Sequence, residues 1–325
     1  MATDAAPLDW MLDTDPALRW QVERDLAGAP RDVYERTRAR IPQEGMGAAL
    51  LAHQDPDGRW ASGAYFPAGF DFEGSEAQSG QPWTATTWTL TTLREFGMDA
   101  APLTGTAQLL AHSARWEYDD LPYWGGEVDV CINAKTLANG VWLGADVAEL
   151  ATWFPAHQLP DDGWNCEWVE GSTRSSFHST LNALKGMLWY EIAVGGAPEV
   201  RASRHRGEEY LLRRSLLRRE STGEPVGAFV SEFGYPWRHR YSVLNAADHF
   251  RAAAKYDGTA PDPRMTEAIE VIRSQRDVAG RWLQQFRLPG RVWLDIDVPV
   301  GEPSPWLTLF ATRVLQWWDE AHSGS

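Results

Sequence analysis

The chain has 325 residues, of which 43% are hydrophobic, so it is long enough for one large domain or two ordinary ones. Its formal net charge of -15 argues against non-specific binding to nucleic acid or to an anionic membrane surface. Two cysteines are too few for a disulfide framework, and there is no run of about 18 apolar residues that would span a membrane. The stretch from Met1 to Asp15 is acidic and interrupted by Pro7, unlike a secretory signal, so we expect a cytoplasmic protein.

Segments with the pattern of helices follow one another along most of the chain. The first is expected to begin at Asp15-Pro16 and to end near Gly28. The others are expected at residues 42–53, 84–96, 103–116, 131–144, 148–157, 176–194, 204–219, 238–255, 263–276 and 304–322. The loop from Ala61 to Gln81 is long, polar and rich in glycine, and loops of this length in a compact domain are often functional.

These segments form a repeat of two helices followed by a turn that contains glycine and tryptophan. Residues 179–184 and 242–247 resemble each other within it. A helix pair buries one face only when a neighbouring pair stacks on it, and pairs that close in a ring leave no exposed ends. We therefore expect an all-α ring of helix pairs, with an open stack of helices as the alternative.

The turn Gln54-x-x-x-Gly58-x-Trp60 resembles the Gln-Trp repeat of the squalene–hopene cyclases. Residues 158–164 and 275–282 resemble looser copies of it, so the resemblance covers most of the chain. It implies a single α/α toroid over residues 1–325, with roughly six inner and six outer helices. The protein prenyltransferase β subunits share this fold.

Asp129-x-Cys131 and Phe177-His178-Ser179-Thr180 resemble the zinc motifs of the protein prenyltransferase β subunits. The resemblance implies that Asp129, Cys131 and His178 bind a catalytic Zn²⁺ ion. The segment before the motif, residues 121–127, contains no basic residue, which argues against a prenyl diphosphate as substrate. Nothing in the sequence indicates an obligate α subunit.

The residue types support a metal site independently of the resemblance. Both cysteines, Cys131 and Cys166, lie near expected helix starts, close in sequence to Asp129 and His178. Thiolate, carboxylate and imidazole are zinc ligands, and a catalytic zinc has three protein ligands and one open position. Cys166 is therefore either a fourth ligand or a wall residue. The alternative is that the cysteines are small buried hydrophobic residues and that His178 is a core histidine.

Two acidic segments are candidate proton donors. The run Glu117-Tyr118-Asp119-Asp120 resembles the catalytic acid motif of the hopene cyclases, although such a run is also typical of an exposed loop. Asp295-x-Asp297 precedes the last expected helix, so Asp297 is a candidate catalytic acid, and a turn is the alternative.

Aromatic residues gather near the expected starts of the inner helices, and an aromatic cavity binds apolar or cationic molecules. For each single residue, plain packing is the alternative. The candidate substrate-binding residues are Trp83, Trp88, Tyr123, Trp124, Trp164, Phe177, His239, Tyr241 and Trp306.

The sequence thus predicts a zinc-dependent enzyme that acts on a small, partly apolar molecule. The metal would activate a thiol or water nucleophile, or polarise an electrophile. One alternative is a metal-independent terpene cyclase that uses one of the acidic segments. Another is a binding module that performs no chemistry.

Overall fold

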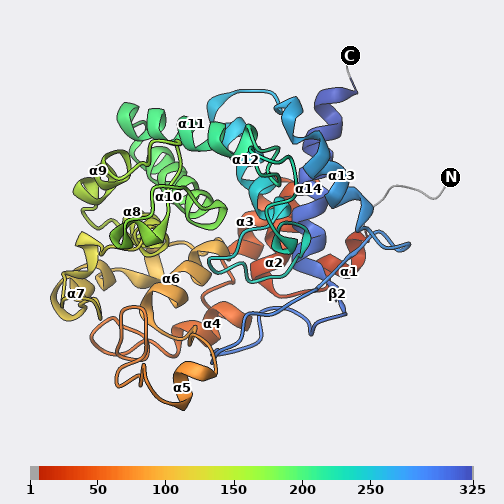
Figure 1. Cartoon of the computed structure of the whole chain (residues 1–325). Helices are drawn as coiled ribbons and strands as arrows, with labels where there is room; N and C mark the ends of the chain where they lie inside the picture. Colours follow the sequence, from red (N-terminus) through yellow and green to blue (C-terminus); the bar gives the residue numbers. More distant parts are fainter. Residues whose placement is uncertain (1–6, 324–325) are drawn as a thin grey trace. The chain divides into compact units, whose positions relative to one another are not determined.

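The computed structural model describes residues 7–323, and these residues are mainly helical (Figure 1). The strands among them are β1 (Trp282–Leu283) and β2 (Pro303–Ser304), which pair antiparallel. The expectation of an all-α protein is therefore confirmed. Within the described range, none of the helices is both long and apolar enough to cross a membrane.

The chain divides into two compact units. The first consists of the residues up to Thr37, Gly207–Arg287 and the residues from Ile296 onward, and the second of Arg38–Arg206 and Leu288–Asp295. Two of the four boundaries fall within α3 (Arg31–Arg38) and α11 (Pro198–Leu212), and the other two lie in the segment between β1 and β2. The single domain expected over residues 1–325 stays a prediction, and residues 1–6 and 324–325 lie outside the described range.

In the second unit, three helices pack side by side in the order α6, α8, α10 (Figure 1). Helices α8 and α10 approach closely because Gly186 has no side chain, and a Cβ atom there would lie 2.6 Å from the carbonyl oxygen of Ala134. Nearby, Lys135 Nζ donates a hydrogen bond of 2.8 Å to Asn182 Oδ1. The elements of this unit are α4 (Gly45–Leu51), α5 (Ser75–Gln78), α6 (Thr86–Glu95), η1 (Ala101–Leu103), α7 (Thr106–Ser113), η2 (Tyr123–Gly125), α8 (Val130–Leu143), α9 (Ala148–Ala156), η3 (Cys166–Glu170) and α10 (Phe177–Val194).

In the first unit, α14 packs against both α12 and α2. The guanidinium of Arg313 on α14 donates to Asp248 of α12 at 2.6 Å and to Asp25 of α2 at 3.0 Å. This pairing satisfies a buried charge, which would otherwise destabilise the fold. The elements are α1 (Leu8–Leu12), α2 (Pro16–Asp25), η4 (Ala228–Ser231), α12 (Val243–Asp257), η5 (Pro263–Met265), α13 (Thr266–Ser274) and α14 (Pro305–His322), with β1 and β2.

The three Gln-Trp segments form turns with the same hydrogen bonds. In each turn, the tryptophan indole N–H donates to the carbonyl oxygen ten residues earlier. These carbonyls belong to Leu50 for Trp60, Phe154 for Trp164 and Ile272 for Trp282, at 2.8, 2.9 and 2.8 Å. The tryptophan backbone N–H donates to a threonine hydroxyl at the start of the following long helix, which is Thr86, Thr180 or Thr308, at 3.0, 3.1 and 3.1 Å. Each turn therefore joins the end of a short helix to the start of a long one.

Two helix starts lie five or six residues away from those expected. Helix α12 begins at Val243 and not near Arg238, because Arg238 has a φ of +53° and the Ser242 side chain caps the helix by accepting from Asn245 N. Helix α11 begins at Pro198, before the expected residue 204, and proline is well suited to the first turn of a helix.

Replacing Trp282 with phenylalanine tests the importance of the repeated turn. The indole is 1% exposed, so Trp282→Phe leaves the carbonyl of Ile272 without its donor and leaves a small cavity. We expect the free energy of unfolding to fall by roughly 1–3 kcal/mol, measured by urea denaturation. Trp317→Phe, at a half-buried position of the same unit, is the matched control and should cost much less. Equal losses in the two variants would contradict the proposed importance of the turn.

Candidate active site

Cys131 and Cys166 lie together in the second unit. Cys131 is buried in the first turn of α8, and Cys166 is the first residue of η3. Their Sγ atoms are 3.4 Å apart, which is within hydrogen-bonding distance and well beyond the ~2.05 Å of a disulfide bond. The only two cysteines of the chain, 35 residues apart in sequence, therefore form a thiol pair.

Cys166 is held against the start of α10 by Ser179. Its backbone N–H donates to Ser179 Oγ at 3.1 Å, and the hydroxyl donates to Cys166 Sγ at 3.4 Å. The backbone N–H of Ser179 is bonded in turn to the side chain of the N-cap residue Ser176. Two residues before Cys166, Trp164 is fixed by the repeated turn, so Cys166 is positioned from both sides.

The contact between the two thiols separates their acidities. It holds the pKa of Cys131 well above its ordinary value, and burial adds to the rise. The same hydrogen bond lowers the pKa of Cys166, with burial opposing it and the Ser179 hydroxyl assisting it. Burial raises the pKa of Asp129, while a hydrogen bond with Cys166 opposes the rise. Cys166 is therefore the thiol that ionises first, and Asp129 is its neighbour.

His178 is the second residue of α10 and is half-buried, directly before Ser179. In the part of the chain that the structure describes, no three of Asp129, Cys131, Cys166 and His178 have ligand atoms that all lie within 4.8 Å of one another. The two thiols already meet, whereas an ion that bound all four groups would require side-chain movement.

A pocket of about 280 Å³ adjoins the thiol pair. Asp129 connects the two, because it lines the pocket and also neighbours Cys166. The other carboxylates that line the pocket belong to Glu117 and Glu127. Its aromatic lining residues are Tyr65, Phe66, Phe72, Trp116 and Tyr118, and Val128 and Ile132 complete it.

Glu127 is the most deeply buried of these carboxylates, with 8% of its surface exposed. Asn133 fixes its backbone, because its Oδ1 accepts from Glu127 N and its Nδ2 donates to Glu127 O, both at 2.7 Å. The preceding Gly126 has a φ of +76°, and a Cβ there would lie 2.4 Å from Asn133 Oδ1, so a larger residue does not fit. Burial first, and then the charge of Asp129, raise the pKa of Glu127 to about 7.

The aromatic wall of the pocket is held in place by Glu117. Its carboxylate accepts hydrogen bonds from the backbone N–H groups of Ala64, Tyr65 and Phe66, at 3.0, 3.1 and 3.1 Å. Further along the same loop, Phe70 and Phe72 pack against Phe66 with ring centroids 4.9 and 4.8 Å away. The long loop singled out in the sequence therefore forms one side of the pocket.

None of the candidate substrate-binding residues is among the residues that line this pocket, although Trp88 packs against Tyr65 and Tyr123 against Trp116. Trp164 anchors a repeated turn, and Tyr241 donates through its hydroxyl to the carbonyl of Leu216. His239 and Trp124 are half-buried. The buried members are Trp83, Trp88, Tyr123, Trp164, Phe177, Tyr241 and Trp306. Sequence reasoning missed the five lining aromatics, three of which lie in or beside the long loop that it had marked as functional.

The candidate acids have structural partners. Glu117 holds the loop as described, and Asp119 and Asp120 are exposed residues with a positive φ. Asp297, in the first unit, accepts from the hydroxyl of Ser304 at 2.6 Å and from Val298 N at 2.9 Å. Since Ser304 caps α14, the Asp297 carboxylate supports the start of that helix.

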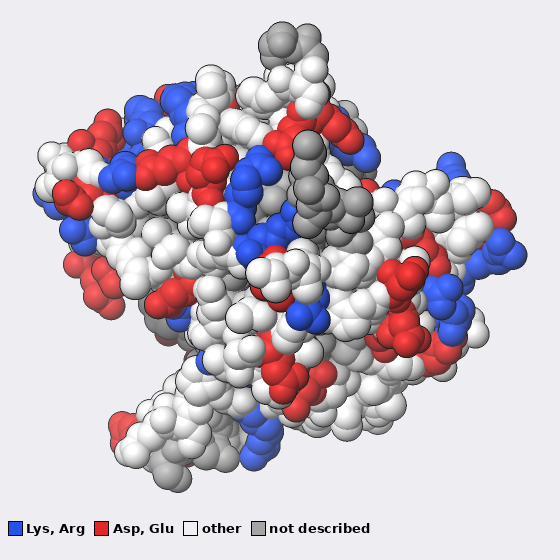
Figure 2. Space-filling view, turned by 90° about the vertical axis from the view of Figure 1, so that its right-hand side faces the viewer, with Lys and Arg blue, Asp and Glu red and all other residues white. Residues whose placement is uncertain are grey.

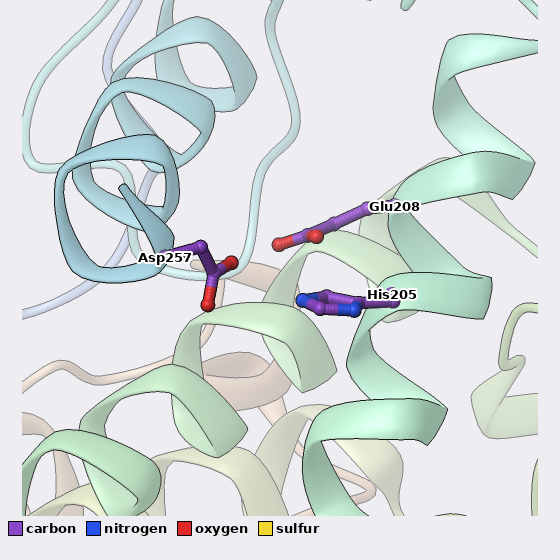
Figure 3. Close-up of side chains that lie close together, drawn as sticks. All are labelled: His205, Glu208 and Asp257. Atoms are coloured by element: carbon purple, nitrogen blue, oxygen red, sulfur yellow. The ribbon is translucent and has the colours of Figure 1, made fainter. Parts of the chain in front are cut away.

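A second group of potential metal ligands lies on α11 and α12 (Figure 3). His205 and Glu208 project from the same side of α11, and the carboxylate oxygens of Glu208 and Asp257 lie within 4.8 Å of each other. His205 is exposed and Asp257 is half-buried. The Glu208 carboxylate is already engaged, because its Oε1 lies 2.9 Å from Nε2 of the buried His249.

On the face shown in Figure 2, acidic side chains are interspersed with basic ones.

No protein-family model matches this chain, and no curated protein matches it in sequence.

The Asp297 carboxylate should make the stability of the protein depend on pH. Burial raises its pKa to about 6 against 3.8 for the ordinary group, so the folded state favours the protonated form. The stabilisation is complete below about pH 4 and is lost as pH rises through 6, by on the order of 2 kcal/mol. Urea unfolding of Asp297→Asn at several pH values should lack this loss.

Asp277 provides a control of opposite sign. Burial opposes the shift, but hydrogen bonds from the backbone N–H groups of Arg281 and Ala279 lower its pKa. The ionised Asp277 therefore stabilises the fold above its lowered pKa, and this contribution is lost as pH falls through that pKa. Asp277→Asn should lack the contribution. If the free energy of unfolding changes equally with pH in the wild type and in Asp297→Asn between pH 4 and 6, the role given to Asp297 is wrong.

Replacing Glu208 tests the buried pair in the first unit. Glu208→Ala leaves the buried Nε2 of His249 without this acceptor and should lower the free energy of unfolding by about 1–3 kcal/mol. The adjacent Glu209 pairs with Arg264 on the surface, so Glu209→Ala should cost about 1 kcal/mol or less. Both are measured by urea denaturation, and a smaller loss for Glu208→Ala than for Glu209→Ala would refute the assignment.

Proposed function

We propose that this protein is a zinc-dependent enzyme that acts on a small, partly apolar molecule in the pocket beside Cys131 and Cys166. The observation that carries the proposal is the pair of thiols 3.4 Å apart. Asp129 links the two features, because it lines the pocket and neighbours Cys166.

The donor groups suit zinc. Two thiolates on a tetrahedral zinc ion, each about 2.3 Å from the metal, lie about 3.8 Å apart, so the observed pair needs to separate only slightly. Asp129 adds a carboxylate two residues before Cys131, and His178 adds an imidazole directly before Ser179, whose hydroxyl contacts Cys166. We therefore assign Cys131, Cys166, Asp129 and His178 as the groups that supply the metal ligands, and three of them bound at one time would leave the fourth position open for water or substrate.

Bound zinc would supply a Lewis acid or activate a thiol or water nucleophile. The chain's own residues provide the surroundings for this chemistry. Ser179 orients the sulfur of Cys166, while the loop held by Glu117 places aromatic side chains in the wall of the pocket. A site of this kind favours a substrate with apolar groups.

We infer that the fold is the α/α toroid that the sequence repeat predicts. In support, α6, α8 and α10 pack in chain order within the second unit, and α12 and α14 do so within the first. The shared hydrogen bonds of the three tryptophan turns also support a structural repeat. In such a fold α8 and α10 would both be inner helices, with the metal-binding groups at their starts.

Metal analysis of protein purified without an immobilised-metal column tests the proposal. We expect about one zinc ion per chain in the wild type, and loss of the metal in Cys131→Ala and Cys166→Ala. His112→Gln, an exposed histidine of the same unit, is the matched control and should keep the metal.

The second ligand group gives the test a contrasting outcome. If zinc binds at α11 and α12, then His205→Ala loses the metal while Cys131→Ala keeps it. That result, or wild-type protein that takes up no zinc after incubation with the ion, would overturn the proposed function.

A further inference from the structure

We infer that the pocket beside the thiol pair binds an organic cation, a small molecule that carries an ammonium group on an apolar body. This inference deepens the proposed function, because it names the substrate class of the same site. The buried carboxylate of Glu127 and the aromatic wall carry it, and both are independent of the metal.

The first step is the charge of the pocket. Three carboxylates line it, those of Glu117, Glu127 and Asp129, and its described lining includes no lysine, arginine or histidine. The pocket therefore has no internal counter-charge. An anionic ligand would meet only acidic groups in this lining, whereas a cation would be attracted to them.

One carboxylate oxygen of Glu127 lacks a hydrogen-bond donor. Glu127 is 8% exposed, and its Oε1 atom is buried without a hydrogen-bond partner among the described residues. A buried acceptor without a donor is unfavourable, and most such atoms in proteins are paired. Since Glu127 lines the pocket, a ligand that turns this carboxyl group toward the pocket can supply the donor. An ammonium N–H group offers both the hydrogen bond and the opposite charge.

The third step is the aromatic wall. Tyr65, Phe66, Phe72, Trp116 and Tyr118 line the same pocket as the carboxylates. The face of an aromatic ring attracts an ammonium group, and aromatic cages are the usual recognition device for alkylated ammonium ions. The same rings also pack against the apolar part of a ligand. A simple inorganic cation would use the carboxylates alone and would leave these rings without a role.

The size of the pocket suits a small ligand. The pocket measures about 280 Å³, near the lower end of the range for small-molecule sites. Phe72 and Tyr118 are 56% and 49% exposed, so they form the rim, whereas Glu127 lies deeper. The charged end of the ligand is therefore placed at Glu127 and its apolar body against the rings.

Binding of two matched probes to the full chain tests the inference. Phenethylammonium and the neutral 2-phenylethanol share one apolar body, and calorimetry at pH 7 and constant ionic strength compares their affinities. We expect the ammonium probe to bind at least about tenfold more tightly. Equal affinities would overturn the inference.

Three variants locate the binding. Glu127→Gln keeps the shape and removes the charge, so it should weaken the ammonium probe about tenfold and leave 2-phenylethanol unchanged. Glu149→Gln removes an exposed carboxylate of α9 and is the matched control for net charge. Phe72→Leu, at the exposed rim, removes a ring that packs against the apolar body, so it should weaken both probes, and it locates the binding if Glu127→Gln does not fold. Equal effects of Glu127→Gln and Glu149→Gln would refute the site. No effect of Phe72→Leu on either probe would also refute the site.

The failure of this inference is distinguishable from the failure of the zinc proposal. The titrations are repeated on chelator-treated wild type and on Cys131→Ala. A preference for the ammonium probe that persists in both supports the pocket, whether or not zinc binds. Zinc content that depends on Cys131, together with no preference between the probes, would remove the organic cation and leave the metal site in place.

Discussion

The structure depends above all on how each repeated tryptophan is held at the end of its short helix. One side chain and one backbone N–H join two helices: the indole bonds the carbonyl at the end of the preceding helix, and the N–H bonds a threonine at the start of the next. Both bonds are buried, so breaking either would leave an unsatisfied polar group. In the second unit this turn delivers Cys166, two residues after Trp164, to the start of α10.

Close packing between α8 and α10 completes the thiol pair. A glycine at position 186 allows the backbone of α10 to approach Ala134 on α8, and Lys135 bonds Asn182 across the same interface. Because Cys131 lies one turn before these residues on α8, the contact fixes its position relative to Ser179. The 3.4 Å distance between the thiols therefore results from two independent constraints, one in the turn and one between the helices.

The electrostatics of the site follow from bringing acidic groups together in a buried place. Burial raises the pKa values of Asp129 and Glu127, and the charge of Asp129 adds to the rise at Glu127. Such an arrangement favours ligands that bring positive charge. A metal ion at the thiols and an ammonium group in the pocket can both be bound. Asp129 neighbours Cys166 and also lines the pocket, whereas Glu127 lines only the pocket.

The sequence by itself determined the helical class and the repeated turns, because glycine, proline and tryptophan act locally in the chain. It also marked Cys131, Cys166 and the start of α10 as neighbours in the repeat. Only the tertiary structure decided where the pocket lies. Glu117 reads as part of an exposed acidic loop, yet it binds backbone groups more than 50 residues away and so holds Tyr65 and Phe66 in the wall of the pocket that Glu127 also lines. Contacts of that range leave no periodic trace in the sequence, whereas the buried aromatics at helix starts do leave one and are not among the residues that line this pocket.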